Sequence, residues 1–164
     1  MQKEINEVLE FVKNCKFNDA IESLNKIILN NQQNLTLYNL RAICHLELSN
    51  YVEAKSDFTK VLTSKPNWPE IYNNLGILHY NLGQNQLAIT NFLKSIEIKK
   101  DFEPAIFGLI KSLAHVQSVT DNNSLFISKH NELNRIKINY SENEYIEDRT
   151  IKDLLNTINE IIND

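Results

Sequence analysis

The order of apolar and polar residues along the first hundred positions predicts a succession of amphipathic helices. In YNNLGILHYNLGQNQLAITNF (72–92), large residues return every three or four positions on both sides of a polar break at 83–86. This spacing places them on one face of a helix, whereas a strand would need strict alternation. With only 3 glycines and 3 prolines, the chain is suited to long helical runs and poorly suited to an all-β fold.

The helical pattern repeats with a period of 34 residues. A small residue returns at this interval: Ala20, Ala54 and Ala88. A large apolar residue follows each of them four positions later: Leu24, Phe58 and Phe92. The copies follow one another without an insertion and cover residues 1–34, 35–68 and 69–102. A period of this length indicates stacked supersecondary units, because one helix pair alone cannot bury its apolar face.

The repeated residues resemble the tetratricopeptide repeat (TPR), whose pattern is W-x2-L-G-x2-Y…A-x3-F…P over 34 residues. The third copy matches it best, at Tyr72, Leu75, Gly76, His79, Ala88 and Phe92. The second copy has Arg41 where the pattern has leucine, and the first copy departs from it at Glu4 and Glu7. The resemblance, which covers residues 1–102, implies an all-α, right-handed α-solenoid of antiparallel helix pairs. Small residues such as Gly76 would let neighbouring helix backbones approach closely.

Beyond residue 102 the pattern weakens without disappearing. The stretch EPAIFGLIKSLAHV (103–116) keeps the apolar spacing of a first helix, with Pro104 in the first turn, where proline is tolerated. After a polar break, residues 124–138 are expected to form its partner helix. We therefore expect a degenerate fourth pair at 103–138, a repeat domain at 1–140, and a separate C-terminal amphipathic helix at 141–164.

The predicted C-terminal helix begins after Thr150, which has Asp153 three places on, similar to a capping box. Its apolar residues form one stripe: Ile151, Leu154, Leu155, Ile158, Ile161 and Ile162. Two interpretations stay open. The helix could cap the last pair, as solenoids require. Alternatively, it could dock on the concave face of the array or on a second copy.

Charge and composition exclude several classes of function. The formal net charge of −4 and the pI of about 5.6 argue against nucleic-acid binding. The N-terminus carries Glu4, Glu7 and Glu10, so it is no secretory signal, and no apolar run is long enough for a membrane span. Two cysteines, Cys15 and Cys44, are too few for a disulfide framework, which indicates a reducing, cytoplasmic compartment.

No motif for catalysis or cofactor binding is present. The three glycines form no phosphate-binding loop, and the chain has neither HExxH nor GxSxG. His45 and His79 lie at equivalent repeat positions, with Cys44 adjacent to the first, but the position normally holds a core aromatic residue and no ligand spacing supports a metal. We expect no catalytic residue, cofactor or metal.

The resemblance implies a concave face, lined by the first helix of each pair, that holds a peptide or a helix of a partner. The predicted contacts are Ile5, Leu9, Asn39, Ile43, Leu46, Asn73, Ile77, Tyr80, Asn81, Phe107 and Lys111. Neighbouring candidates on the same helices are Val12, Lys13, Glu47 and His115. Asn39 and Asn73 are one repeat apart, and their amides could bind the main chain of a peptide, although asparagine is abundant throughout the chain.

Members of the family that bind chaperones hold a terminal carboxylate with lysine and asparagine in one repeat, asparagine in the next, then lysine and arginine. The corresponding positions in this chain are Ile5, Leu9, Leu40, Glu70 and Asn74. Because none of these five side chains is cationic, the sequence predicts no binding to chaperone tails. The predicted function is a non-enzymatic protein–protein interaction module. The alternative is the N-terminal interaction module of a larger bacterial enzyme, such as a transferase or oxygenase.

Overall fold

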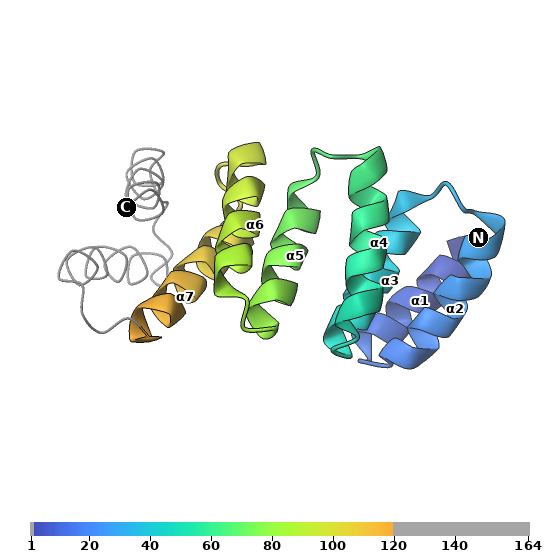
Figure 1. Cartoon of the computed structure of the whole chain (residues 1–164). Helices are drawn as coiled ribbons and strands as arrows, with labels where there is room; N and C mark the ends of the chain where they lie inside the picture. Colours follow the sequence, from blue (N-terminus) through green and yellow to red (C-terminus); the bar gives the residue numbers. More distant parts are fainter. Residues whose placement is uncertain (1, 120–164) are drawn as a thin grey trace.

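The computed structural model describes residues 2–119, and this part of the chain consists of seven α-helices without a strand (Figure 1). The helices are α1 (Gln2–Lys13), α2 (Phe17–Asn30), α3 (Leu35–Glu47), α4 (Tyr51–Ser64), α5 (Pro69–Asn81), α6 (Asn85–Ile98) and α7 (Glu103–Val119). The all-α array of helix pairs expected from the repeat is confirmed. Helix α7 is three residues longer than the predicted 103–116. The predicted helices at 124–138 and 141–164 lie outside the described residues.

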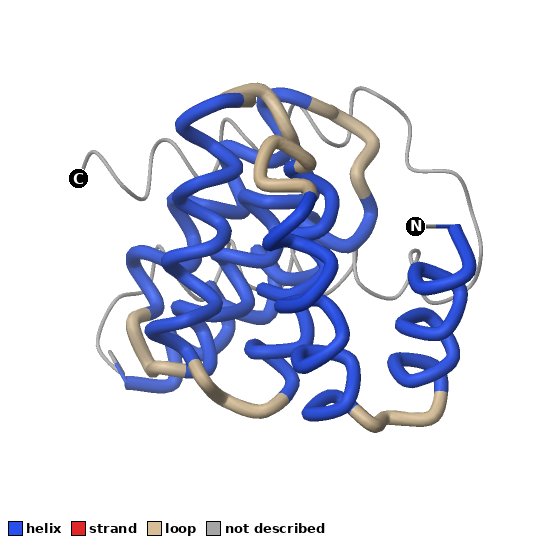
Figure 2. Tube along the Cα trace, turned by 90° about the vertical axis from the view of Figure 1, so that its right-hand side faces the viewer, coloured by secondary structure: helices blue, strands red, loops and turns tan. Residues whose placement is uncertain are grey.

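Short turns join the two helices of each pair, and the pairs follow one another along the molecule (Figures 1 and 2). The first helices of neighbouring pairs also pack on one another, α3 on α5 and α5 on α7. The second helices α2, α4 and α6 have no comparable contact among themselves. The array therefore brings its first helices closer together than its second helices, and the first helices line its inner face.

The turn inside each pair has the same backbone conformation. Cys15, Ser49 and Gly83, one repeat apart, have φ values of 55°, 60° and 71°. In the third pair the Gly83 N–H donates to the Tyr80 carbonyl and the Gln84 N–H to the His79 carbonyl, both at 2.9 Å. These two bonds define a Schellman motif, which recurs in the other two turns. Only the third turn uses glycine, the residue that adopts positive φ without a steric cost.

The ring of Phe92 fills the space between α5 and α7. A Cβ atom added to Gly76 of α5 would lie 2.5 Å from this ring, and one added to Gly108 of α7 would lie 2.4 Å from it. Phe92 itself is buried. Both glycines are therefore required by packing, since a methyl group at either position would overlap the aromatic ring.

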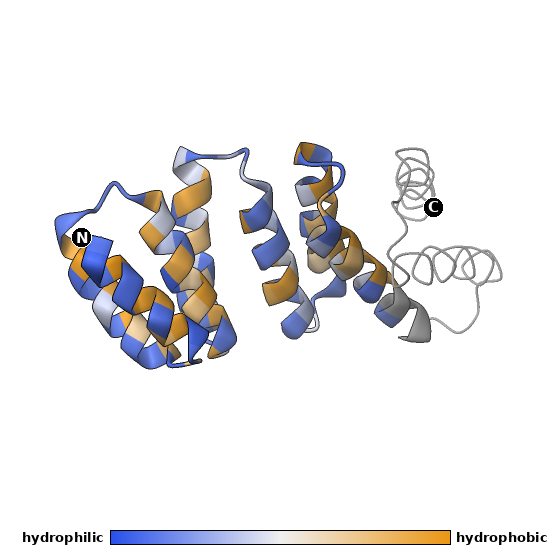
Figure 3. Ribbon diagram, turned by 180° about the vertical axis from the view of Figure 1, so that it is seen from behind, coloured by the Kyte–Doolittle hydropathy of each residue, from blue (hydrophilic) through white to orange (hydrophobic). Residues whose placement is uncertain are grey.

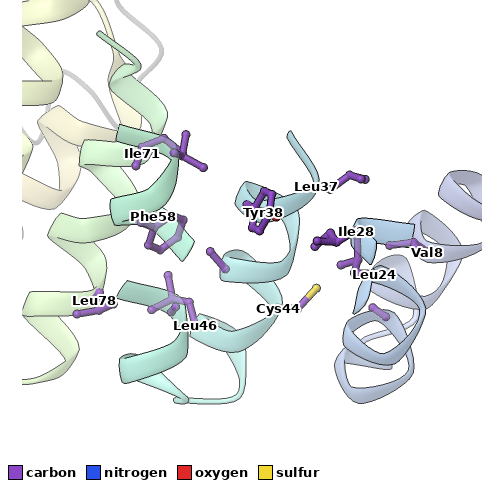
Figure 4. Packing of buried hydrophobic residues seen from close by; sticks show 14 of the residues in the cluster. Val8, Leu24, Ile28, Leu37, Tyr38, Cys44, Leu46, Phe58, Ile71 and Leu78 are labelled. Atoms are coloured by element: carbon purple, nitrogen blue, oxygen red, sulfur yellow. The ribbon is translucent and has the colours of Figure 1, made fainter. Parts of the chain in front are cut away.

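Buried apolar side chains run continuously from α1 to α5, as the close view of Figure 4 illustrates between Val8 and Leu78. A second cluster joins α6 to α7 and includes Phe92, Ile106 and Leu109. The hydropathy colouring of Figure 3 shows polar residues concentrated at the loops and along the outward sides of the helices. Each helix pair thus shares its core with the next pair, as expected for stacked repeats.

The departure of Arg41 from the repeat pattern has a structural partner. Its Nε and Nη2 donate to the two carboxylate oxygens of Asp57 at 2.7 and 2.8 Å, and its Nη1 donates to Asn25 Oδ1 at 2.6 Å. The hydrogen bond to Asp57 raises the pKa of Arg41. The guanidinium therefore links α2, α3 and α4 through a bidentate ion pair, and Asp57 can be buried because it is paired.

We predict that Gly76→Ala lowers the free energy of unfolding by about 1–3 kcal/mol, because the new methyl group overlaps the enclosed ring of Phe92. Helix propensity alone would give the opposite sign, with a gain of about 1 kcal/mol. Adding Phe92→Leu should make the combined loss smaller than the sum of the two single losses. Urea denaturation of the full chain measures these energies, with the exposed Ser56→Ala as a control for helix propensity. A stabilised Gly76→Ala variant would contradict the packing.

We also predict that Cys15→Gly raises the free energy of unfolding by about 0.5 kcal/mol, since glycine relieves the cost of positive φ but gains entropy in the unfolded chain. The matched change Gly83→Ala, at the equivalent turn position, should lower it by about 1 kcal/mol. Thermal and urea denaturation measure both variants. Equal signs for the two changes would refute the assignment of a common turn.

Candidate functional site

The inner face is formed by the sides of α1, α3, α5 and α7 that point away from the second helices. One helix position, repeated every 34 residues, holds Leu9, Ile43, Ile77 and Lys111. Leu9 is 48% exposed and Ile77 is 37% exposed, while Ile43 is half-buried. Phe107, one turn before Lys111 on α7, is 52% exposed. Large apolar side chains on consecutive first helices are therefore open to solvent on a single face.

Two asparagines lie beside this apolar row, one on α3 and one on α5. The side-chain oxygens of Asn39 and Asn73 are both buried and accept no hydrogen bond. Asn73 is only 6% exposed, and its Nδ2 donates to Asn74 Oδ1 over a long 3.4 Å. A buried amide oxygen without a donor costs roughly 1–3 kcal/mol. The inner face thus carries two equivalent acceptors whose desolvation is not compensated by the residues around them.

Tyr80 connects α5 to α7 at the end of this face. The Lys111 ammonium lies 4.7 Å from the centre of the Tyr80 ring, within the range of a cation–π interaction. His115 meets the same ring edge-on at 6.0 Å. Tyr80 is half-buried and packs against the α6–α7 core cluster, so its ring position is fixed from below. These contacts hold a cation beside exposed apolar groups.

The remaining predicted contacts divide by burial. Leu46 differs from the expectation of an open contact, because it is buried in the core on the side of Phe58 and Leu78 (Figure 4). It lies one turn from Glu47, and the helix twist carries it under the α3–α5 contact. Ile5 and Val12 are half-buried against the core, and Asn81, Lys13 and Glu47 are exposed at helix ends. Sequence spacing alone did not separate these environments.

The two histidines occupy the core aromatic position of the repeat. His79 is buried, and its Nδ1 lies 2.7 Å from Gln84 Oε1. His45 is half-buried, and burial lowers its pKa. Burial also raises the pKa of Cys44 to about 11, so its thiol stays protonated at neutral pH. Within residues 2–119, no three metal-ligating side chains form a group, and no helix is long and apolar enough to cross a bilayer.

Helix pairs stacked in register, with exposed apolar and amide groups on the first helices, define the class of tetratricopeptide-repeat proteins. Comparison with known proteins agrees. The family model described as coatomer epsilon subunit matches residues 9–119, which is more than half of the chain. The chain therefore belongs to the coatomer epsilon subunit family.

Individual relatives are also repeat proteins. Heat shock protein STI1 of Saccharomyces cerevisiae is 31% identical over 94 residues, which are 57% of this chain and 16% of STI1. The chain thus matches only a small part of that relative. The second TPR domain of human RPAP3, solved with an HSP70 peptide, gives a TM-score of 0.61 at 24% identity, covering 66% of this chain and 91% of that one.

Two further solved structures extend the likeness. The Sgt2 TPR domain from Aspergillus fumigatus gives a TM-score of 0.67 at 15% identity, covering 74% of this chain and 82% of that one. MamA gives a TM-score of 0.66 at 19% identity, covering 85% and 81% of the two chains. At these identities the likeness establishes the fold alone.

The solved complex with an HSP70 peptide makes the predicted lack of a carboxylate clamp testable. The five equivalent positions lie on α1, α3 and α5 and supply no cation: Ile5, Leu9, Leu40, Glu70 and Asn74. We predict no binding of the peptide SGPTIEEVD at about 100 μM, measured by fluorescence polarisation. The second TPR domain of human RPAP3 is the positive control. A dissociation constant in the micromolar range would show that another arrangement holds the carboxylate.

Proposed function

We propose that this chain is a non-enzymatic interaction module that binds a segment of a partner protein on its inner face. The observation that carries the proposal is the row of exposed apolar side chains on successive first helices, Leu9, Ile77 and Phe107, beside the two unpartnered amide oxygens. Exposed apolar groups lose water on contact with a partner, which contributes roughly 25 cal/mol per Å² of buried apolar area. Amides supply direction by bonding to a main chain.

Asn39 and Asn73 have a specific part in this proposal. A rotation about the terminal torsion of either side chain, which has a broad and shallow energy profile, would bring its oxygen to a main-chain N–H of the bound segment. Because the oxygen already lacks a donor in the free protein, this bond would be gained without breaking another. The inner face would then select a segment by its apolar spacing and its backbone, with little dependence on charge.

The proposal includes a reducing, cytoplasmic compartment, in keeping with the free thiols of Cys15 and Cys44. It also includes the absence of catalysis by this chain. The comparisons offer no support for the alternative of an N-terminal module of a transferase or oxygenase. The similar RPAP3 domain was solved with a peptide, which supports a peptide or protein as the partner here.

We predict that Ile77→Asp combined with Phe107→Asp reduces capture of the partner at least about thirtyfold, the loss expected when a central contact worth about 2 kcal/mol is removed. Affinity capture from lysate, followed by quantitative mass spectrometry, measures the effect on the full chain. The matched control is Leu29→Asp with Val52→Asp, which are 72% and 80% exposed on second helices. Circular dichroism confirms that each variant is folded.

The outcomes separate clearly. A protein retained by the wild type and the control, and lost only with the inner-face variant, supports the proposed function. Equal loss with the control variant would indicate a binding surface that is not restricted to the first helices. Equal retention by all three chains would refute the inner face as the binding surface.

A further inference from the structure

We infer that residues 150–164 of this chain occupy the inner face across α3, α5 and α7 as an internal ligand, which a partner must displace. The inference rests on the proposed function, because it names what regulates the same face. The apolar side chains to be covered are Ile43, Ile77 and Phe107. Segment 150–164 lies outside the described residues, so the argument uses its sequence and the described face.

The segment has the chemistry that this face requires. Its six apolar residues fall within one narrow stripe of a helix, whereas Asp153 and Glu160 fall on the opposite side. The stripe from Ile151 to Ile162 is about 16 Å long in helical form. Adjacent helix axes are about 8–10 Å apart, so a stripe of this length reaches across three neighbouring first helices.

Charge also favours an uncharged contact between the segment and the face. Residues 1–119 carry 12 basic and 12 acidic side chains, so the net charge of −4 belongs to residues 120–164. A repeat array without net charge neither attracts nor repels this acidic region over a distance. With its carboxylates on the outer side, the docked segment would bind through apolar contacts, and its affinity would change little with salt concentration.

The connecting chain is long enough for this contact. Thirty residues separate Val119 from Thr150. If 124–138 form the helix that their sequence predicts, the other 15 residues can still extend to about 50 Å. The nearest part of the face lies on the same helix, because Phe107 is 12 residues before Val119, or about 18 Å along α7. Docking therefore requires no separation of the repeats.

A cap on the last helix pair is the competing role for the segment. A cap would bury the stripe against the end of the array. It would leave Leu9 and Ile77, on α1 and α5, in contact with water. Docking on the inner face instead covers Ile77 and Phe107, which are exposed on adjacent helices in the described structure. The two roles therefore differ in which side chains of the array are needed for the contact.

The test uses a fluorescent synthetic peptide of residues 146–164 and four forms of the full chain. They are the wild type, a tail variant (Leu155→Asp with Ile158→Asp), the tail variant with Ile77→Asp and Phe107→Asp added, and the tail variant with Leu29→Asp and Val52→Asp added. Fluorescence polarisation measures binding. A linked segment has an effective concentration near 1 mM, so the wild type should bind the peptide at least about tenfold more weakly than the tail variant.

The proposal expects strong binding by the tail variant and by its outer-face control, and loss of binding when the inner face is changed. Raising sodium chloride from about 50 to 500 mM should change the affinity less than about twofold. Equal binding by wild type and tail variant, or no effect of the inner-face changes, would overturn the proposal. A lower melting temperature of the tail variant without a gain in peptide binding would also overturn it, in favour of a cap.

If the tail variant does not fold, cross-linking of a folded chain decides. With Cys15→Ser in place, Ile77→Cys and Ile158→Cys should form an intramolecular disulfide on mild oxidation, whereas Leu29→Cys with Ile158→Cys should not. The absence of the first bond would refute docking. If the partner is still captured through the inner face but the peptide is not bound, only this inference fails. If inner-face changes affect neither, the proposed function fails as well.

Discussion

The close approach of helix backbones around one large side chain is the constraint on which the array depends. In the third repeat, Phe92 is enclosed by Gly76 and Gly108, with no room for a single added carbon at either position. The other repeats satisfy the same volume differently. The first has Val8 at the glycine position and the smaller Leu24 in place of phenylalanine, and both are buried. Each repeat therefore conserves the sum of the volumes while the individual residues differ.

This packing determines where a binding face can form. A large side chain on the second helix fits between two first helices, so successive first helices, as in α5 and α7, come together. Their opposite sides then lie next to one another at intervals of one repeat. Ile43 and Ile77, which have no part in enclosing Phe92, become neighbours on that face through the same 34-residue register. The inner face is therefore a consequence of the core geometry, and its chemistry is free to vary with the residues placed there.

The sequence predicted the helix pairs and their register because small and large residues alternate at intervals that only a repeated helix pair explains. It did not predict the positive φ of Cys15, since a cysteine gives no local signal for a left-handed turn, although its alignment with Gly83 one could have used. It also did not predict the pairing of Arg41 with Asp57, which are 16 residues apart on different helices. Leu46 was expected on the open face, and its burial depends on the angle between α3 and α5, which residue spacing does not contain.

Residues that depart from the repeat pattern fall into two groups with different physical consequences. Arg41 replaces an apolar residue, but Asp57 and Asn25 satisfy its donors, so its cost is compensated inside the protein. Asn39 and Asn73 place polar oxygens where no described residue donates to them. A buried acceptor that stays unpaired lowers stability, and packing gives no reason to keep two of them one repeat apart. An external donor, aligned by the neighbouring apolar row, would remove that cost at both positions together, which makes the amide pair the strongest link between this fold and its proposed function.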